Sequence, residues 1–190
     1  MKHSFLAKTL VAVALASLAS CKPPATDGFA ERQERAESTT GPSKPLDSPD
    51  TGGAIWSQSA TPMRLIYGKP GQPPLFALAC TSAEGTSALR LTRFAAADEG
   101  AQAFLALIGN GHVARIPIDA VESETGLRWE GMADPDDQRI EAFSGARTVT
   151  ATIPGAGMVK LNPSPLPAEL VEQCRAIDET VTDEPSQPDP

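Results

Sequence analysis

The stretch Ala103–Ile118, AFLALIGNGHVARIPI, decides the fold class. It holds two apolar runs, 103–108 and 112–118, on either side of Asn110-Gly111, a pair that tolerates the positive φ values of a tight hairpin turn. The stretch therefore predicts two antiparallel strands. One alternative stays open, because Asp98-Glu99 is typical of a helix start and residues 103–108 could close a helix begun near Asp98.

Six further stretches are typical of strands, because each is a short alternating or β-branched run bounded by Gly, Pro or Asn. They are residues 63–67, 75–80, 88–94, 127–131, 147–153 and 158–161. With the two hairpin strands they make eight. The sequence thus predicts a mainly β fold, a small antiparallel sandwich or barrel, with α+β character at its margins.

Two helices are predicted at those margins. The first runs from about Pro135 to Phe143, with Asp134 as its N-cap and Pro135 in its first turn. The second runs from Pro167 to about Ile177, where apolar residues recur at helical spacing. The apolar stripe of this second helix includes Cys174.

The apolar residues are concentrated in one segment. Residues 54–177 are dense enough in apolar side chains for one core and are predicted to form a single globular domain. Residues 22–53 are rich in Pro, Ser, Thr and charged residues, which predicts a flexible tether with a short helix possible at 29–37. Residues 178–190 hold five acidic residues and no basic residue, which predicts a disordered acidic tail.

The charge distribution excludes one class of partner. The formal net charge is −8, but residues 54–177 contain ten basic and thirteen acidic residues, so most of the negative charge lies in the flanks. A near-neutral body with an acidic tail argues against nucleic acid, because nucleic-acid binding requires a basic face.

The N-terminus predicts export. Met1–Lys8 is a short basic stretch, and Thr9–Leu18 is an apolar run of about ten residues, far below the roughly 20 that span a bilayer. Residues 1–20 are therefore expected to be a signal peptide. They end at Leu18-Ala19-Ser20-Cys21, which resembles the lipobox of bacterial lipoproteins. The resemblance implies cleavage before Cys21 and lipid modification of its thiol.

The same resemblance implies a location. In this class the mature N-terminal cysteine carries three acyl chains such as palmitate, more than stable anchoring requires. Lys22 follows Cys21, whereas Asp at that position is the inner-membrane retention cue in enteric-type bacteria. We therefore expect a protein anchored in the cell envelope, on the outer membrane and facing the periplasm, with residues 21–53 as lipidated cysteine and tether.

Once Cys21 is lipidated, two cysteines remain. Cys80 ends a predicted strand and Cys174 lies on the C-terminal helix, so in an oxidising periplasm they are expected to form a disulfide that ties this helix to the sheet. On the chain-entropy model, closing a loop of about 93 residues stabilises the fold by about 4 to 5 kcal/mol. This order of elements over residues 75–174 is similar to that of uncharacterised periplasmic lipoproteins of Gram-negative bacteria.

Catalytic motifs are absent from the sequence. It has no nucleophile elbow, metalloprotease helix, phosphate-binding loop or Cys-x-x-Cys, and His112 is the only histidine left after signal removal. Glu122, Glu124 and Glu130 lie close in sequence, and paired carboxylates can hydrolyse glycosidic bonds, although solvated charges are the expected interpretation. The acidic run at 134–137 is explained by a helix N-terminus rather than by calcium. No cofactor or metal is predicted.

Several cations fall in or beside predicted strands: Arg90, Arg115, Arg128, Arg147 and Lys160. Alternation places some of them on one outer face, which either meets an anionic envelope component or is an ordinary charged exterior. Trp129, between Arg128 and Glu130, is predicted to point into the core.

Together these features predict a membrane-anchored envelope lipoprotein whose body is a non-catalytic binding or envelope-maintenance module. Its expected partners are the membrane, through the lipid anchor, and peptidoglycan or an envelope protein. The alternative hypothesis is a cell-wall hydrolase that uses a carboxylate pair among Glu122, Glu124, Glu130 and the cluster that begins at Asp134.

Overall fold

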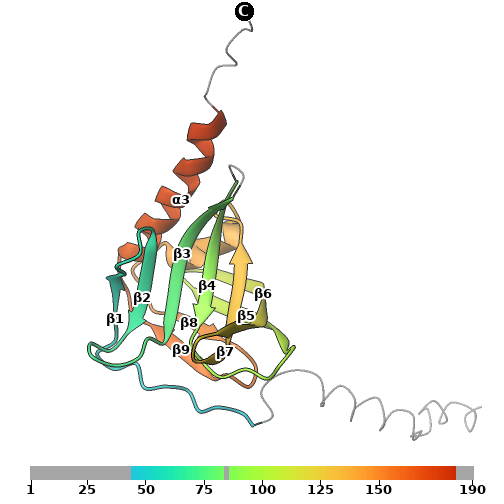
Figure 1. Cartoon of the computed structure of the whole chain (residues 1–190). Helices are drawn as coiled ribbons and strands as arrows, with labels where there is room; N and C mark the ends of the chain where they lie inside the picture. Colours follow the sequence, from blue (N-terminus) through green and yellow to red (C-terminus); the bar gives the residue numbers. More distant parts are fainter. Residues whose placement is uncertain (1–43, 84–85, 183–190) are drawn as a thin grey trace, which may run out of the picture. The chain divides into compact units, whose positions relative to one another are not determined.

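The computed structural model describes residues 44–83 and 86–182 (Figure 1). The expected signal peptide, the lipobox with Cys21, the possible helix at 29–37 and most of the expected tether lie outside these described residues.

The turn at Asn110-Gly111 forms as its residues require. Asn110 and Gly111 have φ values of 51° and 88°, and they join β5 (Gln102–Gly109) to β6 (His112–Ser123). The two strands pair in antiparallel register from Gly109↔His112 to Gln102↔Asp119. The strand prediction for residues 103–108 is therefore confirmed, and the helix alternative is wrong.

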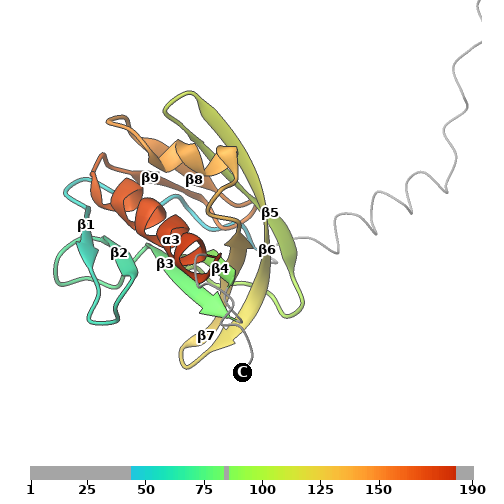
Figure 2. The same cartoon turned by 90° about the horizontal axis from the view of Figure 1, so that it is seen from above.

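Within the described residues, nine strands form one antiparallel sheet. The other seven are β1 (Ile55–Gln58), β2 (Arg64–Gly68), β3 (Phe76–Ala83), β4 (Thr86–Arg93), β7 (Gly126–Ala133), β8 (Val149–Thr152) and β9 (Met158–Leu161). Their order across the sheet is β1-β2-β3-β4-β7-β6-β5-β8-β9. The sheet curls into a nearly closed barrel (Figure 2). The prediction of a mainly β fold is confirmed, and of its two forms the barrel is the one observed.

All eight predicted strands are present, but β1 was not predicted. Its sequence, IWSQ, is short and has no clear alternation, although Trp56 is buried and pairs across the strands with Tyr67. The largest difference in length is at β6, which continues past Ile118 to Ser123 because its far end pairs with β7.

The first predicted helix begins later than expected. It is a 3₁₀-helix, η2 (Gln138–Phe143), and its N-cap is Asp137, whose side chain accepts a hydrogen bond from the backbone N–H of Arg139. Asp134 instead caps a preceding turn, because its carboxylate accepts the N–H of Asp136 at 2.8 Å. The predictions of Asp134 as N-cap and of helix at Pro135 are therefore wrong, since the acidic residues divide between two successive turns.

The C-terminal helix is longer than expected. α3 spans Leu166–Thr182, so the first five residues of the expected acidic tail, 178–182, are helical. Residues 183–190 lie outside the described part of the chain. Figure 2 shows α3 lying between the β1–β4 wall and β8–β9, where it packs against the inner side of β1 to β4.

The end of the expected tether packs against the barrel. We call residues 46–54 the strap. The N–H of Leu46 donates to the carbonyl oxygen of Gly155 at 2.8 Å, and the Ser48 hydroxyl oxygen accepts the N–H of Met158 at 3.0 Å. At the other end of β9, the Asn162 side chain donates to the carbonyl oxygens of Thr51 and Ala54. The strap therefore runs beside β9 to β1, and the ordered body begins before residue 54.

One core is shared by all nine strands, η2 and α3. Trp129 is fully buried, as predicted, and its indole N–H donates to the carbonyl oxygen of Ala96 at 3.3 Å. The side chains that point outward from the strands are thus carried on a rigid, fully packed wall.

Candidate interaction surface on the outer side of β5

The predicted disulfide is present between Cys80 on β3 and Cys174 on α3. The two Cα atoms are 5.6 Å apart, and Cys174 is fully buried. The bond fixes α3 against the inner side of the sheet, so it braces the scaffold and leaves no free thiol at these positions. Cys21, the predicted lipidation residue, lies outside the described residues.

The carboxylates proposed for hydrolysis do not form a pair. Glu124 lies in the β6–β7 turn and Asp134 follows the last residue of β7. An eight-residue strand is roughly 26 Å long at about 3.3 Å per residue, whereas the two carboxylates of a glycosidase lie within about 10 Å of each other.

Glu122 and Glu130 are also separated. Glu130 lies opposite Asp119 on the outer side of the sheet, while Glu122 lies opposite Leu127 and alternates to the other side. Glu130 accepts a 2.8 Å hydrogen bond from Arg128 Nε, so it is already paired. The structure therefore does not support these residues as an acid and base.

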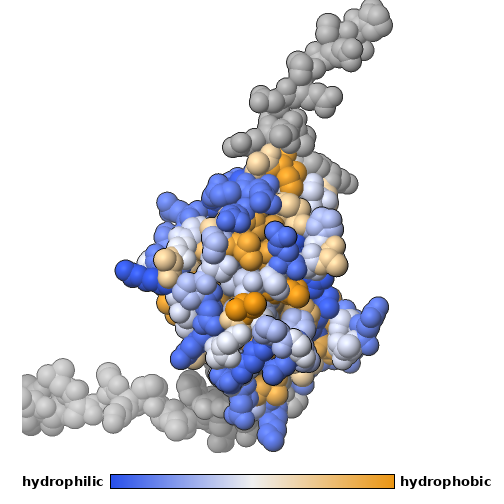
Figure 3. Space-filling view, turned by 90° about the vertical axis from the view of Figure 1, so that its left-hand side faces the viewer, coloured by the Kyte–Doolittle hydropathy of each residue, from blue (hydrophilic) through white to orange (hydrophobic). Residues whose placement is uncertain are grey.

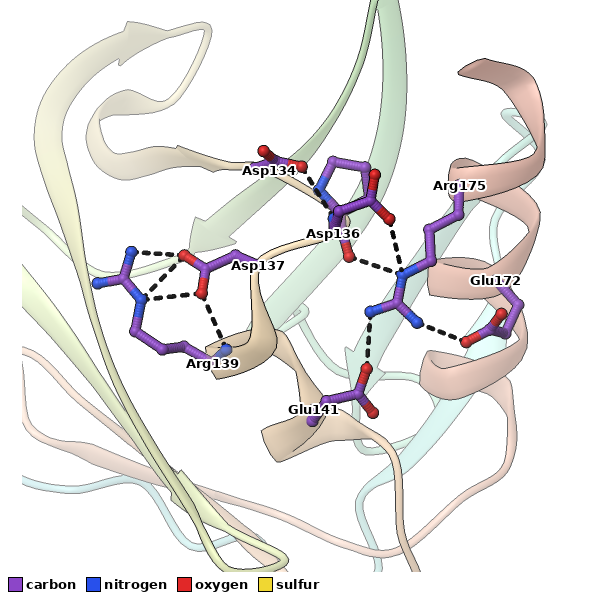
Figure 4. Close-up of polar contacts among 8 residues, drawn as sticks. Asp134, Asp136, Asp137, Arg139, Glu141, Glu172 and Arg175 are labelled. Atoms are coloured by element: carbon purple, nitrogen blue, oxygen red, sulfur yellow. Dashed lines mark hydrogen bonds and ion pairs between the residues drawn. The ribbon is translucent and has the colours of Figure 1, made fainter. Parts of the chain in front are cut away.

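The acidic run before η2 is part of an ion-pair cluster with a structural role (Figure 4). Arg175 on α3 reaches toward it: its Nε donates to the carbonyl oxygen of Pro135 at 2.8 Å, and its two terminal nitrogens bind Glu141 at 2.7 Å and Glu172 at 2.6 Å. The hydrogen bond from Arg175 holds the pKa of Glu141 below its ordinary value. The cluster joins α3 to η2, and Glu141 and Glu172 are both engaged by Arg175 in that contact.

Arg93 is a buried cation, and no carboxylate pairs with it among the described residues. Its guanidinium donates to the carbonyl oxygens of Leu75, Phe94 and Ala156 at 2.8–3.3 Å, and burial lowers its pKa to about 10. Because Ala156 lies in the β8–β9 turn, these bonds connect the end of β4 to that turn across the interior.

The side of β1 and α3 has a small groove and a mixed surface. The groove has a volume of about 160 Å³ and is lined by polar and apolar side chains alike, among them Met63, Leu166 and Gln173. Figure 3 shows that hydrophobic surface on this side is interrupted by hydrophilic side chains. This side therefore presents no continuous face of one chemical kind.

Apart from the buried Arg93, the cations on the barrel fall into two groups. Lys69, Arg128, Arg139 and Arg175 each form an ion pair. In the described part of the chain, Arg64, Arg90, Arg115, Arg147 and Lys160 have no carboxylate partner. Four of the five predicted strand cations are thus unpaired, the exception being Arg128.

Two of these unpaired cations flank an apolar surface centred on β5. We call it the β5 face and define it by the outward side chains of four neighbouring strands: Phe104, Ala106 and Ile108 of β5, Val113, Arg115 and Pro117 of β6, Thr150 and Thr152 of β8, and Met158 and Lys160 of β9.

Strand register places these side chains in rows. One row is Arg115–Ala106–Thr152–Met158, and the next is Val113–Ile108–Thr150–Lys160. Phe104 and Pro117 face each other in the following row. The two cations therefore lie on the outer strands, β6 and β9, with apolar and hydroxyl side chains between them.

The apolar side chains of the β5 face are unusually open. Val113 is 60% exposed, Phe104 58% and Ile108 52%. Scattered single apolar residues are normal on a protein surface, but a contiguous group marks an interaction site. No carboxylate belongs to the face; the nearest on these strands is Asp119, at its margin, which accepts a hydrogen bond from Gln102.

No family model, curated protein or solved structure matches the chain. Within residues 44–83 and 86–182, no group of His, Cys, Asp and Glu side chains could hold a metal ion. None of the described helices is long and apolar enough to cross a membrane. The β5 face is accordingly the feature on which a function can be argued.

The sequence identified part of this surface. Arg115 and Lys160 were predicted as outward cations, but Phe104, Ile108 and Val113 were not singled out. Residues 103–108 are all apolar, so alternation cannot tell which side of β5 is covered. Arg147 and Arg90 lie elsewhere: Arg147 lines a small cavity with Trp56, and Arg90 lies on β4 opposite Met132. His112 begins β6, as expected for a strand-end histidine.

Proposed function

We propose that the chain is a lipoprotein anchored through Cys21 to the outer membrane and facing the periplasm, and that its body is a non-catalytic binding module. The observation that carries the binding role is the β5 face, an exposed apolar surface with unpaired cations on a disulfide-braced barrel. Such a surface on a rigid wall is suited to binding, because little side-chain and backbone freedom is lost on contact.

The anchor is supported by the sequence. A basic and apolar leader precedes Leu18-Ala19-Ser20-Cys21, and the small residues before the cysteine suit a signal-peptidase cleft. The Cys80–Cys174 disulfide fits an oxidising compartment such as the periplasm. Both observations agree with export, and neither depends on the β5 face.

A binding role is favoured over hydrolysis by the placement of the carboxylates. Glu124 and Asp134 lie at opposite ends of β7, and Glu130 is held by Arg128. General acid catalysis requires a carboxyl group within hydrogen-bond reach of the leaving oxygen and a second carboxylate across the same bond. The positions of Glu124, Asp134 and Glu130 do not favour such an arrangement.

Fractionation tests the anchor. The full-length chain and its Cys21→Ser variant are expressed in a Gram-negative host, and membranes are separated by density. We expect the wild-type protein in the outer-membrane fraction and the variant in the soluble periplasmic fraction. Membrane partition that does not change in the variant would overturn the lipoprotein assignment.

Site-specific cross-linking tests the binding surface. A photoreactive residue is placed at Val113 on the β5 face or, as control, at Ile55 on β1, which is similarly exposed at 53%. In intact cells we expect strong cross-linking to an envelope component from position 113 and weak cross-linking from position 55. Equal labelling from both positions, or release of wall fragments from purified sacculi by the wild-type protein, would contradict a non-catalytic module that binds through this face.

A further inference from the structure

We infer that the β5 face docks on the anionic headgroup surface of the membrane that holds the lipid anchor. This inference rests on the proposed anchor and names the partner of the proposed binding surface. Three features support it: the charge of the face, its exposed apolar side chains, and the point at which the chain leaves the body.

The charge of the β5 face is complementary to anionic lipid. Arg115 and Lys160 lie on its two outer strands and form no ion pair among the described residues. The outward side chains between them on β5 and β8 are uncharged. Each cation near an anionic lipid surface strengthens binding roughly fivefold. A surface that carries phosphate groups therefore satisfies both cations without displacing an existing partner.

The apolar side chains suit the boundary between headgroups and acyl chains. Phe104, Ile108 and Val113 are each more than half exposed, and they lie beside the cations rather than apart from them. Amphipathic surfaces that combine apolar and basic side chains lie in the membrane interface with their apolar groups buried at the headgroup boundary. The β5 face has this composition on a sheet instead of a helix.

The chain leaves the body next to this face. Leu46, which is 38% exposed, is bound to Gly155 in the β8–β9 turn, and β9 supplies Met158 and Lys160 to the β5 face. Only 22 residues separate Cys21 from Lys44, which limits the distance between the anchor and this exit point to at most roughly 75 Å. The proposed anchor therefore keeps the body close to the membrane, with the β5 face next to the exit point. Lys44, at the exit, adds a further cation.

Another side of the barrel provides a matched control. Arg64 on β2 and Arg90 on β4 are also unpaired, and both face Ala79 on β3. Only Ala79 lies between them, so this pair has the charge of the β5 face without a large apolar side chain between the two cations. Reversing either pair changes the net charge of the protein by the same amount.

The test is vesicle binding by the full mature chain, oxidised and carrying Cys21→Ser so that no acyl chain contributes. Co-sedimentation is measured with vesicles of phosphatidylethanolamine and phosphatidylglycerol and with vesicles of phosphatidylcholine alone. We expect binding at least fivefold tighter to the anionic vesicles, and weaker binding as salt rises. R115E/K160E should lose more than tenfold in affinity, while R64E/R90E should change less than twofold.

Fluorescence gives a second readout at the face itself. Phe104→Trp is expected to be quenched by brominated lipid in anionic vesicles, and Ile55→Trp, on β1, is not. Absence of anionic preference, equal losses in the two double variants, or quenching only at position 55 would overturn membrane docking and leave an acidic protein as the partner of the face. Because the chain tested has no acyl group, none of these results depends on whether Cys21 is lipidated.

Discussion

The Tyr67 hydroxyl donates a 2.8 Å hydrogen bond to the carbonyl oxygen of Lys160, although the two residues lie on β2 and β9, near opposite ends of the strand order. The same hydroxyl oxygen accepts the N–H of Asn162 at 3.0 Å. Tyr67 is fully buried beside Trp56. These bonds, with the strap, connect the two edges of the sheet and make the barrel nearly closed.

Tyr67→Phe tests this closure. The ring packing is kept, but the carbonyl of Lys160 and the N–H of Asn162 lose a buried partner, so the free energy of unfolding should fall by about 1 to 3 kcal/mol. Urea denaturation followed by circular dichroism measures the change. Thr152→Val, which alters an outward hydroxyl on β8, is the control and should change stability by less than about 0.5 kcal/mol. Equal stability of the two variants would show that these bonds do not hold the edges together.

The ionisation of Tyr67 gives a pH prediction. Burial raises the pKa of its hydroxyl, although the hydrogen bond from Asn162 opposes the shift. The folded state therefore holds this proton more tightly than the unfolded chain. The stabilisation is fully present below the unfolded pKa of about 10 and is lost as pH rises through the folded pKa.

Ultraviolet absorbance of the phenolate measures this titration without interference, because Tyr67 is the only tyrosine. We expect phenolate to form above pH 10 in the folded protein and near pH 10 in urea. The loss of stability at high pH should be smaller in Tyr67→Phe. Titration of the native protein at the ordinary pKa would contradict the buried position.

The sequence was sufficient for eight of the nine strands in the described residues and insufficient for β1 and for the closure. Alternation and turn residues locate strands, because they reflect local side-chain periodicity. The contact between Tyr67 and Lys160 joins residues 93 apart, and no local pattern encodes it. Most of the strap was predicted to be part of the tether, because its contacts are also with residues far away in the sequence. Its composition is that of a loop, and it is held by one backbone bond to Gly155 and by the side chains of Ser48 and Asn162, whose partners are far away in the sequence.

Removal of the disulfide should weaken α3 more than the sheet. The paired substitution C80A/C174A is expected to lower the free energy of unfolding by about 2 to 5 kcal/mol, because the unfolded chain regains the freedom of a long loop. Hydrogen exchange should show greater opening of α3 than of β5 and β6, since β5 and β6 pair with each other and with further strands. Uniform loss of protection would mean that α3 and the sheet unfold as one unit.

Arg175 should control the acid stability of the body. It lowers the pKa of Glu141, so this carboxylate contributes stability above its unfolded pKa and loses it as pH falls through the folded pKa. Arg175→Ala should destabilise the protein by about 1 to 3 kcal/mol at neutral pH. It should also flatten the decline of stability at acid pH.

Arg115→Ala is the matched control for Arg175→Ala, because Arg115 has no carboxylate partner among the described residues. In this variant the free energy of unfolding should decline toward acid pH as it does in the wild type. Urea midpoints measured from acid to neutral pH compare the three proteins. If the decline of stability at acid pH is unchanged in Arg175→Ala, the contact between α3 and η2 is not the cause of that decline.

The candidate surface was only partly predictable, for a physical reason. Outward cations such as Arg115 interrupt an apolar strand and are visible in the sequence. Phe104 and Leu105 are both large and apolar, yet one is 58% exposed and the other is fully buried. The difference depends on which side of β5 faces the core, and that is fixed by pairing with β6 and β8 rather than by the residues themselves.

The side chain of Asn110 should contribute to stability in addition to the positive φ that the residue adopts in the turn. Its amide nitrogen donates to the carbonyl oxygen of Ala142 at 2.9 Å, and its side-chain oxygen accepts the N–H of Arg147 at 3.0 Å. Asn110 therefore joins the β5–β6 turn to η2 and to the segment that follows it. Asn110→Gly keeps the positive φ and loses these bonds. Asn110→Ala loses the bonds and also strains the backbone.

We therefore expect Asn110→Gly to lower the free energy of unfolding by about 1 to 2 kcal/mol and Asn110→Ala by about 1 kcal/mol more. Urea denaturation measures both, and hydrogen exchange at Arg147 reports the lost bond directly. Gly145→Ala provides an independent check, because a Cβ there would collide with the Asn110 side chain. If Asn110→Gly were as stable as the wild type, the turn would need only its φ values, and the contacts with η2 and the segment after it would not contribute to stability.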